Sequence, residues 1–223
     1  MRTLYHYMLC PFSRKIRLVL GEKRLDFDVE NERFWERREA FLAMNPAGPV
    51  PVFVDLNGTV LADSSVMCEY LEEAYPERLL IGNGVAHRAE VRRLAAWFDG
   101  KFANEVSLPL IFEKTLRRFM REAGPTNSQA IRQAKSMINY HLDYISWLID
   151  RRKWLAGDDL SLADLAAAAH LSVIDYLGDV PWDNHEVAKD WYMRIKSRPS
   201  FRPILQDRLG GLTPAEHYQS LDF

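Results

Sequence analysis

A proline in an unusual place marks the first segment that could bind a small molecule. Pro51 follows Val50 and enters a run of apolar, partly β-branched residues. Proline lacks a ladder donor and sits at the start or edge of a strand, and it is the residue at which a cis peptide bond is least costly. A cis bond before Pro51 would turn the Val50 backbone N–H and C=O outward. They could then pair with an extended ligand as an added strand.

A carboxylate and a hydroxyl form the second such segment, Asp63-Ser64, at the start of a helical pattern. Beside the free N–H groups of a helix N-terminus, these side chains could hold an ammonium and a carboxylate together. With Val50 and Pro51 they predict a site for a small zwitterionic peptide, for which glutathione is the candidate. Alternatively all four residues are structural, with Ser64 capping the helix.

Two potential nucleophiles lie in a third segment, Cys10-Pro11-Phe12-Ser13. Cys10 falls between a predicted strand and a predicted helix, so its thiol is expected at the helix N-terminus, where the dipole favours a thiolate. Arg14 and Lys15 would add positive charge one turn away. Ser13 is the alternative, because its hydroxyl could donate to the sulfur of a bound thiol. Cys10 could also be a small apolar filler, and Cys68 is expected to be buried and inert.

The elements that position these segments alternate between strand and helix patterns over residues 1–77. Asn57-Gly58 marks a hairpin turn between the last two strands. The order β-α-β-α-β-β-α predicts a thioredoxin-like domain. Strands are predicted at 3–7, 27–29, 51–55 and 60–62, and helices at 11–21, 34–44 and 64–74.

The rest of the chain is predicted to be a linker, 78–86, and an all-helical domain, 87–223, with a tail from about residue 209. Ser161 and Asp164 form a capping-box pattern in front of an alanine-rich helix. That helix is apolar nearly all round, which predicts the buried centre of the second domain. His170 on it is expected to be a hydrogen-bonded core histidine.

Composition narrows the classes of function. The chain has 223 residues, 48% apolar residues and a formal net charge of −2, which argues against general nucleic-acid binding. Its paired basic residues, such as Arg14-Lys15, are expected on solvated helix faces. Neither a transmembrane segment nor a signal peptide is predicted, and no metal-ligand set is recognised. Two cysteines are too few for a disulfide scaffold, which favours a cytoplasmic protein with reduced thiols.

Several short motifs, in order along the chain, resemble the cytosolic glutathione S-transferase superfamily. They are Cys10-Pro11-Phe12-Ser13, Asn45-Pro46-Ala47-Gly48-Pro49-Val50-Pro51, Asp63-Ser64, Ser161-Leu162-Ala163-Asp164 and Arg198-Pro199-Ser200-Phe201. The resemblance implies a homodimer in which Val50 pairs with the cysteinyl backbone of glutathione. It also implies that Asp63 and Ser64 hold the γ-glutamyl end, although the family more often has glutamate in place of Asp63.

The same resemblance bears on the possible chemistry of Cys10. Cys-Pro-Phe-Ser is similar to the motif of omega-class transferases, whose cysteine forms a mixed disulfide with glutathione, and to that of one-cysteine glutaredoxins. Because Ser13 stands where a second cysteine would be needed, any redox cycle would require external glutathione as the resolving thiol.

The carboxy-terminal half resembles a narrower group, the FzlA-like bacterial division proteins, which have a transferase fold and bind the tubulin-like GTPase FtsZ. The resemblance lies in residues 170–182, 188–192, 196–203 and 217–223, and in 89–94, 97–99 and 101–102. It implies a dimer that organises FtsZ filaments, with Leu221, Asp222 and Phe223 as candidate partner-binding residues. The apolar tail is expected either to bind a partner or to pack on its own domain.

Three functions are therefore consistent with the sequence. A division protein that binds FtsZ polymers, with little or no transferase turnover, is favoured by the tail and by the Gly178-Asp179-Val180-Pro181-Trp182 segment. A glutathione transferase or omega-like thiol transferase that uses Cys10 or Ser13 is the alternative. A binder of glutathione conjugates without turnover lies between the two.

Overall fold

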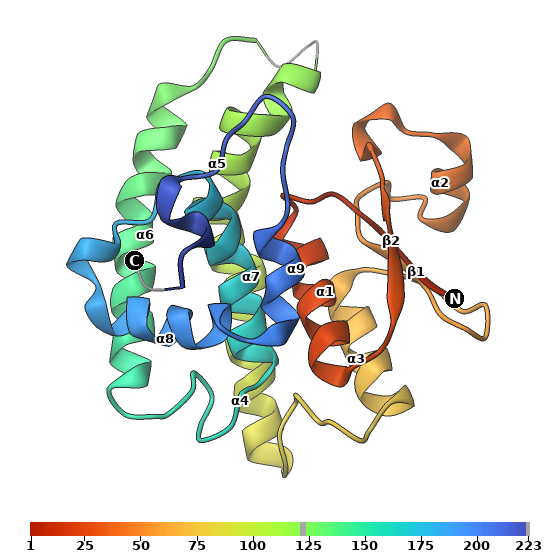
Figure 1. Cartoon of the computed structure of the whole chain (residues 1–223), viewed down its shortest axis with the longest axis horizontal. Helices are drawn as coiled ribbons and strands as arrows, with labels where there is room; N and C mark the ends of the chain where they lie inside the picture. Colours follow the sequence, from red (N-terminus) through yellow and green to blue (C-terminus); the bar gives the residue numbers. More distant parts are fainter. Residues whose placement is uncertain (121–123, 222–223) are drawn as a thin grey trace.

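The computed structural model describes residues 1–120 and 124–221, and its first half is built on a four-stranded sheet (Figure 1). The strand order is β2-β1-β3-β4, with β1 parallel to β2 and antiparallel to β3, and β3 antiparallel to β4. Leu4 pairs with Phe53, which in turn pairs with Leu61. The strands are β1 (Arg2–His6), β2 (Phe27–Asn31), β3 (Val52–Val54) and β4 (Val60–Ala62).

Helices cover both faces of this sheet, and the predicted order β-α-β-α-β-β-α is confirmed. α1 (Pro11–Lys23) and α3 (Ser64–Ala74) lie on the face toward the helical half, while α2 (Glu39–Met44) lies on the outer side (Figure 1). The prediction of one helix over 34–44 was wrong. A short 3-10 turn, Phe34–Glu36, is separated from α2 because Arg37 adopts a left-handed conformation with φ 48°.

The second half is helical, as predicted, and is arranged around α7 (Leu162–Tyr176). Every residue of α7 is buried, and the capping box of Ser161 and Asp164 is present. His170 is a hydrogen-bonded core residue, as expected, with Ser107 Oγ at 2.7 Å from its Nδ1. The surrounding elements are α4 (Val85–Ala96), a π-helical segment (Trp97–Ser107), α5 (Leu108–Ile111), α6 (Ser128–Ile149), α8 (Glu186–Lys196) and α9 (Arg202–Leu205).

The two halves meet where α1 packs between the sheet and α7 (Figure 1). This position buries charged side chains of α1, so the prediction that Arg14-Lys15 lies on a solvated face was wrong. The side chains of Arg14 and Lys15 are 0% and 2% exposed. Burial of a charge is tolerated only with a partner, and here the partners come from the helical half.

The charged side chains of α1, which were expected to contact solvent, form ion pairs with the helical half instead. Asp207 accepts from Arg14 Nη2 at 3.2 Å and from Arg17 Nη1 at 2.7 Å. Glu22 accepts two hydrogen bonds from Arg198, at 2.6 and 2.7 Å. Because guanidinium groups match carboxylates in geometry, these pairs fix the orientation of the two halves.

The segment before α4 is attached to both halves by its backbone. Glu72 Oε2 accepts from the amides of Leu80 and Ile81 at 2.9 and 3.1 Å, and Leu162 N donates to Leu80 O at 2.8 Å. We retain 78–86 as the proposed linker between proposed domains 1–77 and 87–223, although Leu80 and Ile81 themselves are buried.

The carboxy-terminal tail folds back on the helical half. Tyr218 is fully buried, packs edge-on against Tyr176 with ring centroids 5.1 Å apart, and donates to Ile204 O at 3.1 Å. His217 Nε2 lies 2.8 Å from Asp175 Oδ1. Of the two alternatives for the tail, packing on its own domain therefore holds as far as Tyr218.

Candidate functional site

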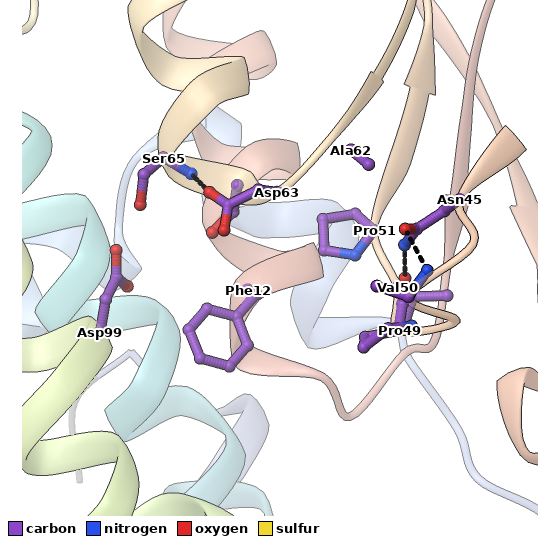
Figure 2. Close-up of a pocket in the computed structure, with 11 residues that line it drawn as sticks. Phe12, Asn45, Pro49, Val50, Pro51, Ala62, Asp63, Ser65 and Asp99 are labelled. Atoms are coloured by element: carbon purple, nitrogen blue, oxygen red, sulfur yellow. Dashed lines mark hydrogen bonds between the residues drawn. The ribbon is translucent and has the colours of Figure 1, made fainter.

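A cavity of about 430 Å³ lies where the loop before β3, the start of α3 and the helical half converge (Figure 2). It brings together the four residues that the sequence nominated for a peptide ligand, Val50, Pro51, Asp63 and Ser64. The other lining residues are Phe12, Asn45, Ala47, Pro49, Ala62, Ser65 and Asp99.

The loop before β3 forms one wall of this cavity. The Val50–Pro51 peptide bond is cis, as the sequence indicated, and Val50 lies just outside the ladder that begins at Val52. Asn45 shapes the loop, because its Nδ2 donates to Pro49 O at 2.7 Å and its Oδ1 accepts from Ala47 N at 3.2 Å (Figure 2). The local sequence thus places the Val50 backbone at the cavity edge.

The opposite wall is the N-terminus of α3. The residue that caps this helix differs from the one expected. Asp63, not Ser64, is the N-cap: its Oδ1 accepts from the amides of Ser65 and Val66 at 2.7 and 3.3 Å. Ser64 is the first helical residue and is buried. The shorter carboxylate of aspartate suits capping, and the observed cap uses only Oδ1.

Asp99, which no motif in the sequence singled out, lines the cavity from the helical half. Its carboxylate is 13% exposed, pairs with Lys15 Nζ and lies 3.3 Å from His170 Nε2. The available signal was an acidic residue directly after Phe98, on a helical segment with an apolar face. Nothing local indicated that this segment would share a cavity with the start of α3, because the two are far apart in sequence.

Cys10 lines a second, apolar cavity of about 370 Å³ that shares Phe12, Pro49 and Val50 with the first. The thiol lies at the N-terminus of α1, as expected, and its Sγ is 3.8 Å from Val50 O. Burial raises the pKa of the Cys10 thiol, and this outweighs the opposing effects of the Ser13 and Phe12 contacts. The expectation of a stabilised thiolate was therefore wrong.

The charge of Arg14 lowers the pKa of Cys10, as expected, but burial raises it by more. Arg14 and Lys15 are paired with Asp207 and Asp99 in the interface between the halves. Ser13, the other candidate nucleophile, is fully buried, and its Oγ accepts from Tyr7 N at 3.4 Å. It lines neither cavity, so it does not reach a ligand there.

Alkylation kinetics test the state of Cys10. We expect Cys10 to react with iodoacetamide more slowly at pH 7 than free cysteine, with a rate midpoint at higher pH, because only the thiolate attacks. Mass spectrometry of the Cys10 peptide measures this separately from Cys68, whose pKa burial raises to about 11. Reaction at pH 7 faster than that of free cysteine would instead show an activated thiolate.

The candidate partner-binding residues end the chain. Leu221 is 40% exposed beyond the buried Tyr218, and Asp222 and Phe223 lie outside the described residues. The segment 178–182, which favoured the division-protein hypothesis, is largely structural. Asp179 is paired with Lys114 and Lys135, and Trp182 Nε1 donates to Asp175 at 2.9 Å.

The described part of the chain offers neither a metal site nor a membrane-spanning helix. Within 1–120 and 124–221, no cluster of histidine, cysteine, aspartate and glutamate has a composition that could hold a metal ion. In the same ranges, each helix is too short or too polar to cross a membrane.

Comparison with known proteins agrees with this architecture. Residues 4–79 match the model of the glutathione S-transferase N-terminal domain, and residues 109–199 match that of the C-terminal domain. FtsZ-localized protein A of Caulobacter vibrioides is 50% identical over 225 aligned residues, which cover 100% of this chain and 98% of the relative.

Solved structures give the same result. The structure of a glutathione S-transferase from Rhodospirillum rubrum F11 superimposes with a TM-score of 0.97 at 55% identity, covering 100% of both chains. That of FzlA from C. crescentus gives a TM-score of 0.95 at 50% identity, covering 100% of this chain and 99% of the other. The chain belongs to the glutathione S-transferase family.

Proposed function

We propose that this protein is a homodimeric cell-division protein that engages FtsZ filaments and has little or no transferase turnover. The observation that carries the proposal is the 50% identity to FtsZ-localized protein A, which extends over the whole chain, tail included. Fold alone would not support it, because one fold hosts many functions.

The chemistry of the site supports low turnover. A thiol transferase needs a thiolate, but burial raises the pKa of Cys10. A serine-type transferase needs a hydroxyl beside the ligand sulfur, but Ser13 is buried and outside both cavities. The two nucleophiles therefore lack the surroundings that catalysis requires.

The end of the tail is the proposed partner-binding surface. Tyr218 and His217 anchor the tail to the helical half directly before this segment. Leu221 is exposed there, and Asp222 and Phe223 follow it in the sequence. We propose that these three residues contact the filament.

A dimer would present two copies of this surface, and the resulting avidity would allow one molecule to join two filaments. An exposed aromatic face supports the proposed dimer. Trp147 and Tyr140 are 50% and 49% exposed. Tyr144 stacks on Trp147, and its ring is tilted by 46° against Trp97 at a centroid distance of 4.7 Å. We also propose a cytoplasmic location, which suits the two free cysteines, Cys10 and Cys68.

Cosedimentation with FtsZ polymers tests the proposal. Deletion of residues 220–223 is expected to weaken binding by about tenfold or more, because a few central side chains carry most of an interface's energy. The folded state should be unaffected, since Tyr218 and His217 remain.

A matched control is Val85→Ser, which alters an exposed apolar side chain at the start of α4, and it should bind FtsZ like the unmodified chain. If the shortened chain cosediments with unchanged affinity, the tail is not the binding surface. If the full chain does not cosediment at all, the proposed function is wrong.

A second candidate, binding of glutathione or its conjugates without turnover, is favoured by the first cavity. It joins the backbone edge at Val50 to the carboxylate of Asp63, which are the features that a zwitterionic peptide requires. In this candidate Val50, Pro51, Asp63 and Ser64 form the glutathione site, and glutathione is a ligand or cosubstrate. An omega-like transferase that uses Cys10 or Ser13 remains the enzymatic form of this alternative.

A further inference from the structure

Two stacked aromatic rings, Trp35 and Phe119, join the two halves of the molecule. Trp35 belongs to the 3-10 turn Phe34–Glu36 in front of α2, and Phe119 to the 3-10 turn Arg117–Phe119 that ends the helical segment after α5 (Figure 1). Their ring centroids are 4.8 Å apart and their planes are inclined by only 5°. The stack therefore connects the segment between β2 and α2 to the helical half.

Behind this stack, aromatic rings continue to the cavity that contains Cys10. Trp35 packs edge-on against Tyr7 and Phe34, with ring centroids 5.4 and 5.2 Å apart. Tyr7 and Phe34 line the Cys10 cavity, whereas Trp35 and Phe119 are not among its lining residues. The rings thus form two layers, with Tyr7 and Phe34 at the cavity and the stacked pair outside them.

Two further cavities, of about 380 and 510 Å³, meet at the stack, and each is lined by both Trp35 and Phe119. The smaller one shares Tyr7 with the Cys10 cavity, and the larger one shares Phe34 and Pro49 with it. Because both outer cavities adjoin the same inner cavity, separation of the two rings would join all three.

The contacts that hold the two rings together are few. Neither 3-10 turn contains a buried residue, and Phe119 is 41% exposed. Arg118 lies 4.8 Å from the centroid of the Phe119 ring and donates to Gly210 O at 3.2 Å. Arg37, which directly follows the turn of Trp35, has a φ of 48° and could act as a hinge. Single aromatic and cation–π contacts are weak, so the rings can separate while both halves stay folded.

We propose that Trp35 and Phe119 form an aromatic latch, which in its closed state keeps bulky apolar molecules out of the cavity beside Cys10. Small molecules have a second route that does not require the latch to open, because the first cavity shares Phe12, Pro49 and Val50 with the Cys10 cavity. The latch thereby selects by size which compounds meet the thiol, and this role is independent of FtsZ binding.

Alkylation of Cys10 by reagents of different size tests the latch. The small reagent is iodoacetamide and the bulky apolar one is N-(1-pyrenyl)maleimide, with mass spectrometry of the Cys10 peptide as the readout. In the unmodified chain, the rate with the bulky reagent relative to the small one should be about tenfold or more below that of free cysteine, as expected for a minor open state. Phe119→Ala should raise the pyrenylmaleimide rate by about fivefold, because loss of an aromatic pair shifts an equilibrium by about two- to tenfold. The iodoacetamide rate should change by less than about twofold.

Two variants and a second thiol serve as controls. Phe119→Tyr keeps the stacked ring and should react like the unmodified chain. Val85→Ala shortens an exposed apolar side chain that lines none of these cavities, and it should leave both rates unchanged. Cys68, which is buried, reports general loosening of the fold and should react at the same rate in every chain.

Three results would overturn the latch. Equal pyrenylmaleimide rates in Phe119→Ala and the unmodified chain would show that bulky molecules reach Cys10 by another route. A parallel rise for both reagents and for Cys68 would show a loosened fold. A lack of size selectivity in the unmodified chain would show that the rings do not close the cavity. Cosedimentation with FtsZ is a separate measurement, so failure of the latch leaves the proposed function in place.

Discussion

Replacement of Asp175 by alanine is expected to lower the free energy of unfolding by about 3–5 kcal/mol, the usual cost of removing one partner of a buried ion pair. Asp175 and Lys196 both have side chains that are 0% exposed, and Lys196 Nζ lies 3.4 Å from Oδ2. Oδ2 also accepts from Tyr192 at 3.2 Å, and Oδ1 accepts from Trp182 at 2.9 Å and lies 2.8 Å from His217 Nε2. The variant would leave the Lys196 ammonium buried without its carboxylate.

Urea unfolding followed by circular dichroism and tryptophan fluorescence measures this effect. Asp175→Asn keeps an acceptor of similar size and should cost less than the alanine variant, whereas Asp143→Ala, at an exposed carboxylate, should change stability by less than about 0.5 kcal/mol. A loss below about 1 kcal/mol in Asp175→Ala would contradict the assigned role, because a buried carboxylate with these contacts should cost more.

Stability is also expected to fall as the pH decreases from about 6.5 to 4, with His6 as a main cause. Burial, followed by the charge of Arg17, lowers the pKa of His6 to about 4, and Nδ1 of this ring has no hydrogen-bond partner among the described residues. Above pH 6.5 the ring is neutral in both states. Between pH 6.5 and 4 the unfolded chain takes up the proton and the folded chain does not, so the unfolded state gains stability. At pH 4.5 this gain amounts to about 2–3 kcal/mol.

The variant His6→Phe isolates this contribution, because it keeps a ring of similar size that does not titrate. The loss of unfolding free energy between pH 7 and pH 4.5 should be smaller in the variant by about 2–3 kcal/mol. His141 and His170, whose pKa values burial also lowers, act in the same direction in both chains and cancel in the comparison. Equal pH profiles for the two chains would show that His6 is not the group responsible.

These buried charges bear on function, because the polar groups near the nucleophile are engaged in structure. Arg14 and Lys15, which could have stabilised a thiolate, are paired with Asp207 and Asp99 in the interface between the halves. The same pairs hold that interface together. The fold retains a cavity of about 430 Å³, while burial raises the pKa of the Cys10 thiol beside it.

Features that depend on neighbouring residues were predicted well from the sequence. The element order of the first half, the cis bond before Pro51 and the capping box of Ser161 and Asp164 are all present. Each of these features follows from contacts within a few residues of the chain. The break at Arg37 was missed because a single left-handed residue leaves no periodic signal.

Features that depend on packing between the halves were decided only by the tertiary structure. Hydrophobic periodicity shows which face of a helix is buried, but not which residues meet it. From the sequence alone, the order of strands and helices could be predicted. The sequence also placed Cys10 at a helix N-terminus, and Val50 and Asp63 in the same domain. Only the tertiary contacts decided that burial raises the pKa of Cys10, that Asp99 joins Asp63, and that Tyr218 holds the tail, because each of these depends on residues far apart in the chain.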